Sequence, residues 1–279
     1  MTGTQMRGAE VPADGPDTSL PFHVVPELTP PKAGKDAMRA AWQVPVEGAE
    51  GRHGVSVRRL QPGEAVVLID GTGAWAQGPV TEVTGRDRFV VQVQEYGLTP
   101  RVQPRVVVVQ AIPKTERADE AIELLTAVGV DEIIAWHAER CIARWRGERV
   151  VRGLTRWRRA AVAASKQARR TTIPDICGPL STAEVCALIQ SATTGLVCAG
   201  PWAPTLAGRV LPQQGQIVIV VGPEGGCTEA ELTALSGAGA QPIALGPTVL
   251  RSAVAGSIAA TLVLAGSGRW HGTTGLDGP

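Results

Sequence analysis

The chain has 279 residues, of which 44% are hydrophobic, and its formal net charge is +1. The length is typical of two domains, and because no apolar run is long enough to cross a bilayer and the N-terminus lacks an apolar segment, we expect neither a membrane span nor a secretory signal. The five cysteines are scattered without a C-x-x-C pair, which is typical of a reduced, cytoplasmic protein, and we expect no metal site.

The N-terminal part of the sequence predicts a leader and a small β domain. Residues 1–19 are rich in Pro, Gly, Asp and Thr and poor in apolar residues, so we expect a disordered leader. The apolar runs 65–69 and 88–94, each bounded by turn residues, predict strands of a small β-barrel that spans residues 20–98. Two prolines within 98–104 mark the domain boundary.

From Arg105 onwards the pattern changes to strands that alternate with helices. Apolar runs rich in Val and Ile predict buried strands at 105–112, 131–136, 195–199, 216–221 and 242–245. Helices are predicted at 115–128, 149–170 and 252–264. This alternation is typical of an α/β domain with a parallel sheet, which we place at 104–270, followed by a flexible tail, 271–279.

Two glycine-containing loops follow strands of this predicted sheet. Val221-Gly-Pro-Glu-Gly-Gly226 precedes a helix whose start is marked by the capping-box pair Thr228 and Glu231. Leu245-Gly-Pro-Thr-Val-Leu-Arg-Ser252 has the same position after the next strand, and Ser252 is its predicted N-cap. Taken alone, each loop is better explained as a tight turn, but two such loops at the ends of consecutive parallel strands favour a small-molecule pocket. Their spacing matches neither a Walker loop nor G-x-G-x-x-G, so we do not expect a phosphate clamp.

One segment of the chain is strongly basic. Residues 140–170 hold eleven Lys and Arg residues and one acidic residue, so the segment carries +10 and the rest of the chain −9. On the predicted helix most of these cations follow helical spacing opposite an apolar stripe. Such a face is commonly only solvated, but the lack of acidic partners favours RNA or another polyanion. The candidate RNA-binding residues are Arg149, Arg152, Arg156, Arg159, Lys166, Arg169 and Arg170.

Two further cations follow the first two strands of the α/β part. Lys114 comes after the first strand and Arg140 after the second, so both are expected at the sheet edge where the loops lie. Each is equally well explained as an ordinary surface residue. His137 is interpreted as structural, and the tryptophans as core residues.

Several motifs occur along the chain in a characteristic order. They are His53-Gly-Val-Ser-Val-Arg-Arg-Leu-Gln-Pro-Gly-Glu64, Val109-Gln-Ala-Ile-Pro-Lys114, Ala121-Ile-Glu-Leu-Leu-Thr-Ala-Val-Gly-Val130, Glu139-Arg-Cys141, Arg156-Trp157, Ser165-Lys-Gln-Ala-Arg169 and the two loops. Together they resemble the RsmE family, SPOUT-class enzymes that methylate N3 of a uridine in 16S ribosomal RNA. The resemblance implies an RNA-binding, PUA-like β-barrel followed by a methyltransferase domain with a C-terminal trefoil knot, an exception to the rule that folds are unknotted.

The resemblance also implies the cofactor, the assembly and the roles of residues. S-adenosylmethionine would be the cofactor, bound largely by main-chain groups, and the protein would be a homodimer acting on small-subunit ribosomal RNA or the subunit. The implied cofactor-binding residues are Leu196, Ala199, Gly222, Glu224, Gly225, Leu245, Gly246, Leu250, Arg251 and Ser252. Arg251, Arg140 and Lys114 are the candidate catalytic residues that stabilise a uridine anion; no general base is evident, and Glu224 is interpreted as ordering its loop.

The sequence also departs from the family pattern. The family usually continues its last motif as L-R-T-E-T-A, whereas this chain has Leu-Arg-Ser-Ala-Val-Ala at 250–255, which loses an acidic residue and a threonine. A catalytically degenerate protein of the same fold that binds ribosomal RNA is therefore the alternative, and affinity for the cofactor discriminates between the two. A nucleotide-binding enzyme is a weaker reading, because no phosphate-binding lysine follows Gly226.

Overall fold

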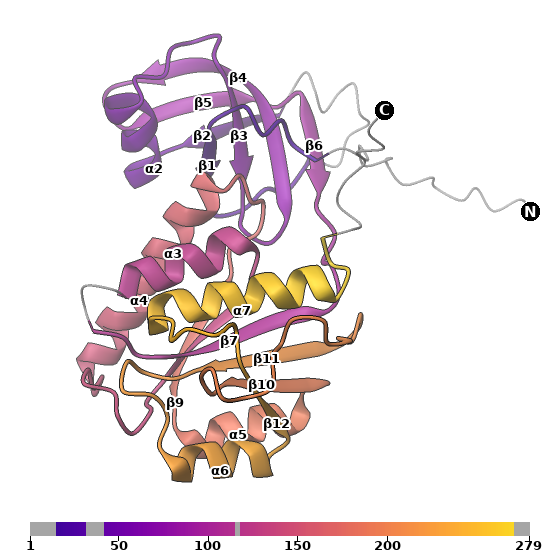
Figure 1. Ribbon diagram of the computed structural model, residues 1–279. Helices are drawn as coiled ribbons and strands as arrows, with labels where there is room; N and C mark the ends of the chain where they lie inside the picture. Colours follow the sequence, from indigo (N-terminus) through magenta and orange to yellow (C-terminus); the bar gives the residue numbers. More distant parts are fainter. Residues whose placement is uncertain (1–14, 32–41, 115–117, 271–279) are drawn as a thin grey trace, which may run out of the picture. The chain divides into compact units, whose positions relative to one another are not determined.

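The computed structural model describes residues 15–31, 42–114 and 118–270, which divide into two compact units (Figure 1). Unit 1 comprises the chain up to Arg101 together with Ser165–Thr172, and unit 2 comprises Val102–Ala164 and the chain from Ile173. In the described ranges no helix is long and apolar enough to span a membrane.

Most of the expected leader and all of the expected tail lie outside the described residues. Residues 15–19 of that leader are described, and they form a turn. The main-chain N–H of Asp17 donates to the Gln77 side chain at 2.9 Å, and the Asp17 carboxylate accepts hydrogen bonds from Ser19. These short polar side chains cap the turn, while the disorder of the leader as a whole stays a prediction.

Unit 1 is built on a six-stranded sheet with the order β1-β3-β4-β5-β2, and β6 pairs with β4. Its elements are β1 (Phe22–Val24), β2 (Gln43–Val46), α2 (Gly48–Arg52), the π-helical turn η1 (His53–Val57), β3 (Ala65–Ile69), β4 (Ala74–Thr84), β5 (Arg88–Gln92) and β6 (Glu95–Leu98). The long strand β4 pairs first with β3 and β6 and then with β5. At the changeover stands Gly78, where an added Cβ would lie 1.9 Å from the Gln92 carbonyl oxygen, so only glycine permits this close crossing.

The segment Ser165–Thr172, which begins in the last turn of the long helix α4 (Glu148–Gln167), belongs to unit 1. Lys166 Nζ lies 2.6 Å from Glu50 Oε1, the Arg169 guanidinium lies 5.5 Å from the centroid of the Phe22 ring, and Thr171 bonds to Thr99. The predicted division at residues 98–104 therefore describes only one of the connections between the units. Sequence composition could not reveal the other two crossings, at 164/165 and 172/173, because these contacts join residues far apart in the chain.

Unit 2 contains a parallel six-stranded sheet with the order β12-β10-β11-β7-β8-β9. The strands are β7 (Arg105–Ala111), β8 (Glu132–Trp136), β9 (Asp175–Leu180), β10 (Thr194–Cys198), β11 (Gln216–Val221) and β12 (Ala240–Ile243). The central strands are fully buried, which explains their continuous Val and Ile runs. The predicted α/β class with a parallel sheet is confirmed, whereas the trefoil knot stays a prediction.

Helices cover both faces of this sheet (Figure 1). α3 (Ala118–Val128) and α7 (Ser252–Gly266) pack together on one face, and α5 (Thr182–Ser191) and α6 (Glu229–Gly237) pack together on the other. On α4 the predicted apolar stripe is present, with Leu154, Trp157 and Ala161 in the core of unit 2. β9 and α5 were not predicted, because β9 is an edge strand interrupted by a Gly-Pro pair and α5 is only weakly amphipathic.

Candidate active site

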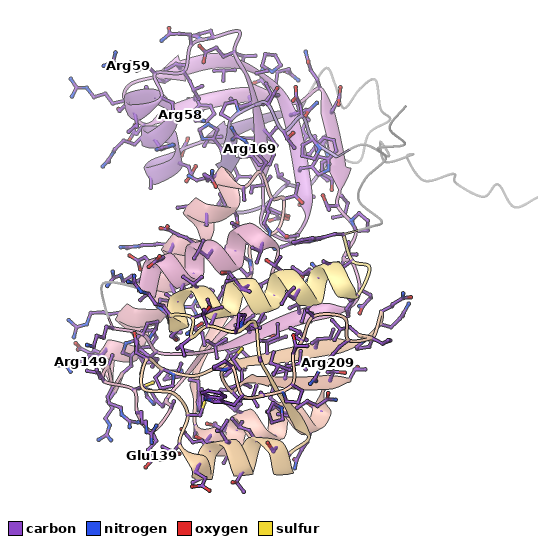
Figure 2. All side chains as sticks on the ribbon, in the orientation of Figure 1. Arg58, Arg59, Glu139, Arg149, Arg169 and Arg209 are labelled. Carbon is purple, nitrogen blue, oxygen red and sulfur yellow. The ribbon has the colours of Figure 1, made fainter. Side chains whose placement is uncertain are left out.

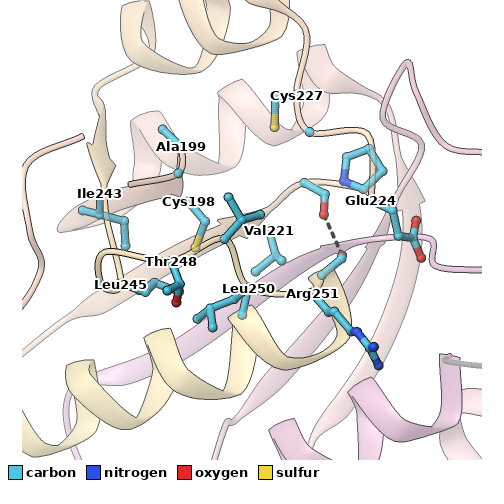
Figure 3. Close-up of a pocket in the computed structure, with 18 of the residues that line it drawn as sticks. Cys198, Ala199, Val221, Glu224, Cys227, Ile243, Leu245, Thr248, Leu250 and Arg251 are labelled. Atoms are coloured by element: carbon cyan, nitrogen blue, oxygen red, sulfur yellow. Dashed lines mark hydrogen bonds between the residues drawn. The ribbon is translucent and has the colours of Figure 1, made fainter. Parts of the chain in front are cut away.

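A cavity of about 410 Å³ opens at the carboxyl ends of β10, β11 and β12. Three loops line it: the residues after Cys198, the loop Gly222–Cys227, and the loop from Leu245 to the start of α7 (Figure 3). In open α/β sheets this edge is where ligands bind, because the loops of neighbouring strands converge there. We call it the loop cavity.

Ser252 connects two of the loops at the bottom of this cavity. Its hydroxyl donates to the Gly222 carbonyl oxygen at 2.7 Å, the bond drawn dashed in Figure 3. The same hydroxyl accepts from Gln110 Nε2 at 3.0 Å. Ser252 was predicted to be the N-cap of the last helix, and this is wrong: the N-cap position is Arg251, without a side-chain cap bond. The buried Ser252 hydroxyl instead bonds to neighbouring elements, which a local capping pattern cannot reveal.

The Gly222–Cys227 loop is also held from its outer side. Arg140 Nη1 donates to the Gly225 carbonyl oxygen at 2.9 Å, and the main-chain N–H of Lys114 points to Glu224 Oε1 at 3.4 Å. After the loop, Thr228 and Glu231 form the predicted capping box. The Glu231 carboxylate, which is buried, also accepts from the main-chain N–H of Glu139 at 2.7 Å. The loops after β8 and β11 are thus fastened to each other.

The part of the loop cavity around Cys198 and Cys227 is mainly apolar, and the charged residues of the cavity lining are Glu224 and Arg251. Cys198 and Cys227 line it, and burial raises the pKa of each thiol to about 12, so both are neutral thiols at pH 7. Gly222 lies beside Cys227, and a Cβ on Gly222 would stand 2.8 Å from the Cys227 sulfur. This surface therefore suits an uncharged, partly apolar ligand portion approached closely by main-chain atoms.

Arg251 provides the positive charge at this cavity. It lines the cavity but is exposed, and its guanidinium extends away from Cys198 and Leu245 (Figure 3). Across the described ranges, no carboxylate lies within salt-bridge distance of Arg251. Its charge is therefore available to a bound molecule.

Eight of the ten residues expected at the cofactor line the loop cavity, and two do not. Leu196 lies inside β10 in the core of unit 2, and Gly225 lies on its loop but outside the lining. Sequence reasoning missed Cys198, Cys227, Ile243 and Ala255, which also line the cavity. Cys198 and Ile243 end parallel strands, so their positions were the available signal.

The candidate RNA-binding residues fall into separate groups. Arg149, Arg152 and Arg156 line a second cavity beside the start of α4, and Arg159 is exposed further along this helix. Lys166, Arg169 and Arg170 lie in the segment that belongs to unit 1. There Lys166 forms an ion pair with Glu50, and Arg169 covers the Phe22 ring. The sequence predicted one basic stripe, but only its first part, Arg149, Arg152 and Arg156, lines the second cavity.

Known proteins identify the family. Residues 101–264 match a family described as an RNA methyltransferase domain, and residues 46–94 match one described as an RNA methyltransferase PUA domain. The chain is 42% identical over 229 residues to ribosomal RNA small subunit methyltransferase E of Mycobacterium tuberculosis, covering 81% of this chain and 87% of that protein. This chain belongs to the RsmE family. The same name is carried by a Bacillus subtilis relative, which is 26% identical over 75% of this chain and 85% of its own length.

Solved structures agree with this membership. Ribosomal RNA small subunit methyltransferase E from Neisseria gonorrhoeae, bound to S-adenosyl methionine, has a TM-score of 0.75 and 26% identity, covering 88% of this chain and 97% of that one. A Legionella pneumophila protein with the bound cofactor SAM has a TM-score of 0.77 at 23% identity, covering 88% and 97%, and this match shows the fold alone. The resemblance stated from the sequence motifs, and the PUA-like domain that it implied, are confirmed.

Proposed function

We propose that this RsmE family member methylates N3 of a specific uridine in 16S ribosomal RNA, using S-adenosylmethionine as the methyl donor. The main support for the proposal is the loop cavity. It is lined by the two glycine-containing loops that the resemblance to the family assigns to the cofactor. Its volume of about 410 Å³ is typical of small-molecule sites. Its neutral thiols and aliphatic lining suit the apolar parts of the donor, and its glycine loops let main-chain groups approach the rest.

The residues around the loop cavity have separate roles in this proposal. When bound, S-adenosylmethionine supplies a methyl group on a positively charged sulfur. Ser252 and Arg140 fix the loop between Gly222 and Gly225, so that the nitrogen acceptor and the methyl group are held in line, which provides much of the rate. Glu224 orders its loop through the main chain of Lys114, and no residue is assigned as the general base.

Arg251 is the catalytic residue of the proposal. Uracil N3 carries a proton in neutral uridine; in the proposed step this proton passes to solvent water, and the electron pair left on N3 then accepts the methyl group. An unpaired guanidinium at the mouth of the cavity stabilises the uridine anion that forms. Lys114 and Arg140 add positive charge at the same edge of the sheet. The target base has to be unstacked from its neighbours to reach this position.

We also propose that the protein works as a cytoplasmic homodimer. Val249 lines the loop cavity and is 83% exposed, and Trp202, in the loop after β10, is 94% exposed. Large apolar side chains this exposed, next to a binding cavity, are typical of a protein interface. A second chain that covers them would also close the cavity. Size measurement in solution tests this, and a monomer at micromolar concentration would contradict it.

The first experiment is calorimetric titration of the purified chain with S-adenosylmethionine, with ATP and NAD as controls. We expect saturable binding of one S-adenosylmethionine per chain and no binding of the controls. The second is incubation with small ribosomal subunits that lack the modification, followed by nucleoside mass spectrometry, for which we expect 3-methyluridine. Absence of methylation in both naked RNA and assembled subunits, with the cofactor bound, would overturn the proposed reaction.

The alternative is a protein that binds ribosomal RNA without methylating it. Its motivation is Ala253, where the family usually has an acidic residue. In the structure Ala253 is buried and lies outside the lining of the loop cavity, while the hydroxyl of Ser252 is retained at the connection to Gly222. These placements favour the enzyme. A folded protein that binds the RNA but not S-adenosylmethionine would favour the alternative.

A further inference from the structure

A second cavity, of about 470 Å³, lies between the loop that follows β8 and the first turns of α4. The guanidinium-bearing residues Arg144, Arg149, Arg152 and Arg156 line it together with the indole of Trp145. We call it the arginine pocket. In the view of Figure 2, Arg149 and Glu139 lie on one side of unit 2 and Arg209 on the other.

The wall formed by Trp145 is fixed by three contacts. Gly153 lies within α4 against the indole, where an added Cβ would stand 2.6 Å from the ring. The Trp157 ring contacts Trp145 edge to face, with centroids 5.2 Å apart. The main-chain N–H of Trp145 donates to His137 Nε2 at 3.2 Å. A glycine in a helix interior destabilises the helix, so its packing role here indicates that the position of this indole is specified.

The charges of the arginine pocket are only partly compensated. Arg156 forms a two-bond ion pair with Asp119, and Arg152 lies 3.4 Å from Glu148 in an exposed pair. By contrast, Arg144 and Arg149 have no carboxylate partner among the described residues. Arg144 donates a hydrogen bond to the Glu139 carbonyl oxygen at 2.7 Å.

His137, next to the pocket, is affected by burial and by these positive charges. Burial, and then the positive charges of Arg144 and Arg146, lower the pKa of His137. His137 is therefore neutral at pH 7 and can accept the hydrogen bond from Trp145. The surroundings of the pocket thus favour an anion.

The combination of an aromatic wall with unpaired guanidinium groups selects a class of ligand. Inorganic phosphate would use the cations and leave the indole without a role, whereas a nucleotide has both a phosphate and a planar base. The position of the arginine pocket relative to the loop cavity indicates that this nucleotide belongs to an RNA chain. It lies beyond β7 and β8, whereas the loop cavity lies beyond β10, β11 and β12, and β7 pairs with β11. Because neighbouring strands are about 4.8 Å apart, the ends of β11 and β8 are separated by about 10 Å, a span that a short RNA segment covers.

We propose that the arginine pocket binds one nucleotide of single-stranded RNA adjacent to the methylated nucleotide. Arg144 and Arg149 hold its phosphate, and its base lies against Trp145. Lys114 and Arg140 stand between the two cavities and follow the RNA backbone. This inference rests on the proposed function for the identity of the RNA, but the binding itself is measured without methylation.

The test uses the full chain and a short fluorescent uridine-rich oligoribonucleotide, with anisotropy measured at several salt concentrations. For the double variant Arg144→Ala/Arg149→Ala we expect at least a tenfold loss of affinity. We also expect the slope of log K against log salt to become shallower by about 0.7, because the two arginines hold one phosphate and each phosphate neutralised on single-stranded RNA contributes about 0.7. Arg146→Ala is the control: it removes one positive charge from the loop that also holds Arg144, outside the pocket lining, and should weaken binding less than threefold.

A second variant tests the aromatic wall. Trp145→Leu keeps an apolar side chain but removes the stacking surface, and we expect about a tenfold loss of affinity with an unchanged salt slope. Calorimetry with S-adenosylmethionine checks that each variant is folded, since the loop cavity is unaltered. Equal losses for Arg146→Ala and the double variant would overturn the pocket and leave only a diffuse basic surface.

Two further outcomes separate this inference from the proposed function. If the wild-type chain binds the oligonucleotide through Arg144 and Arg149 but fails to methylate, the proposed function fails and the pocket stands. If methylation proceeds and the double variant binds RNA like the wild type, the pocket is overturned and the function stands. Competition by an acidic peptide that exceeds competition by unlabelled RNA would assign the pocket to a protein partner and would also overturn the inference.

Discussion

The two cavities of unit 2 lie at one edge of the same sheet but are built from different kinds of atoms. The loop cavity is formed by glycine loops, small side chains and one buried hydroxyl. The arginine pocket is formed by long cationic side chains around an indole. This difference predicts different sensitivities. The loop cavity should respond to an added or removed atom, whereas the arginine pocket should respond to charge and to salt.

The largest effect is expected for Arg251, the one cation that lines the loop cavity in the described chain. Arg251→Ala should lower kcat by about a hundredfold or more, the usual result of removing a group that stabilises a developing anion. Affinity for S-adenosylmethionine should change little, because the guanidinium points away from the apolar lining. Single-turnover methylation and calorimetry measure the two quantities, and Arg251→Lys should recover part of the rate. Unchanged turnover in Arg251→Ala would remove this residue from the mechanism.

An added methyl group tests how closely the loop cavity is packed. In Gly222→Ala the new Cβ would stand 2.8 Å from the Cys227 sulfur, so the loop has to move. Overpacking of this kind costs about 1–3 kcal/mol, and we expect about a tenfold or greater loss of affinity for S-adenosylmethionine.

The compensating change provides the control for Gly222→Ala. Cys227→Ala removes the sulfur, after which the nearest remaining atom of the clash is the Cys227 main-chain nitrogen at 3.2 Å. The double variant Gly222→Ala/Cys227→Ala should therefore bind the cofactor more tightly than Gly222→Ala. Equal affinities would show that the loop accommodates the methyl group by another route.

Removal of the buried hydroxyl should affect both stability and binding. Ser252→Ala removes the hydroxyl partner of the Gly222 carbonyl and leaves Gln110 Nε2 with its bond to the Ala111 carbonyl oxygen alone, while the Oε1 atom of Gln110 is already unpaired in the described structure. A buried polar group left without a bond costs about 1–3 kcal/mol, so the free energy of unfolding should fall by that amount.

Ser257→Ala is the matched control for Ser252→Ala. Its equally buried hydroxyl bonds only to the Val254 carbonyl within the same helix, so its loss should cost less. Urea unfolding of both variants measures the difference. Equal destabilisation would mean that the connection between the two loops contributes nothing beyond an ordinary helix hydroxyl.

How much the sequence could predict depended on whether a feature is local. The parallel sheet, α7 and the capping box of Thr228 and Glu231 follow from periodicity and neighbouring residues, and they were predicted. The role of Ser252 was not, because its partners lie in β7 and in the loop after β11. The same holds for the pairing of Gly153 with Trp145, although a glycine inside an otherwise continuous helix was a signal that could have been followed. The charge pattern of α4 predicted a basic face. It could not show that one part of this face lines the arginine pocket and that the other part belongs to unit 1.

The smallest predicted effect concerns Lys166, at the end of the basic face that belongs to unit 1. Lys166 belongs to the predicted stripe but forms an ion pair with Glu50 in unit 1. Burial opposes ionisation of Glu50, but the close approach of His23 and the bond from Lys166 outweigh it and lower the Glu50 pKa from 4.5 to about 2. Because the pKa is lower in the folded state, the pair stabilises the protein above pH 4.5, and this contribution is lost as the pH falls towards 2.

Lys166→Met should therefore lower the free energy of unfolding at pH 7 by about 1 kcal/mol, a modest value because the pair is partly exposed. The difference from wild type should shrink as the pH approaches 2, the folded-state pKa of Glu50. Arg159→Met, on the same helix and without a carboxylate partner in the described residues, should change stability by less than about 0.5 kcal/mol. If Lys166→Met instead left stability unchanged and reduced oligonucleotide affinity as strongly as the loss of Arg144 and Arg149, then Lys166 would act with them in RNA binding. The contrast between the two parts of α4 would then disappear.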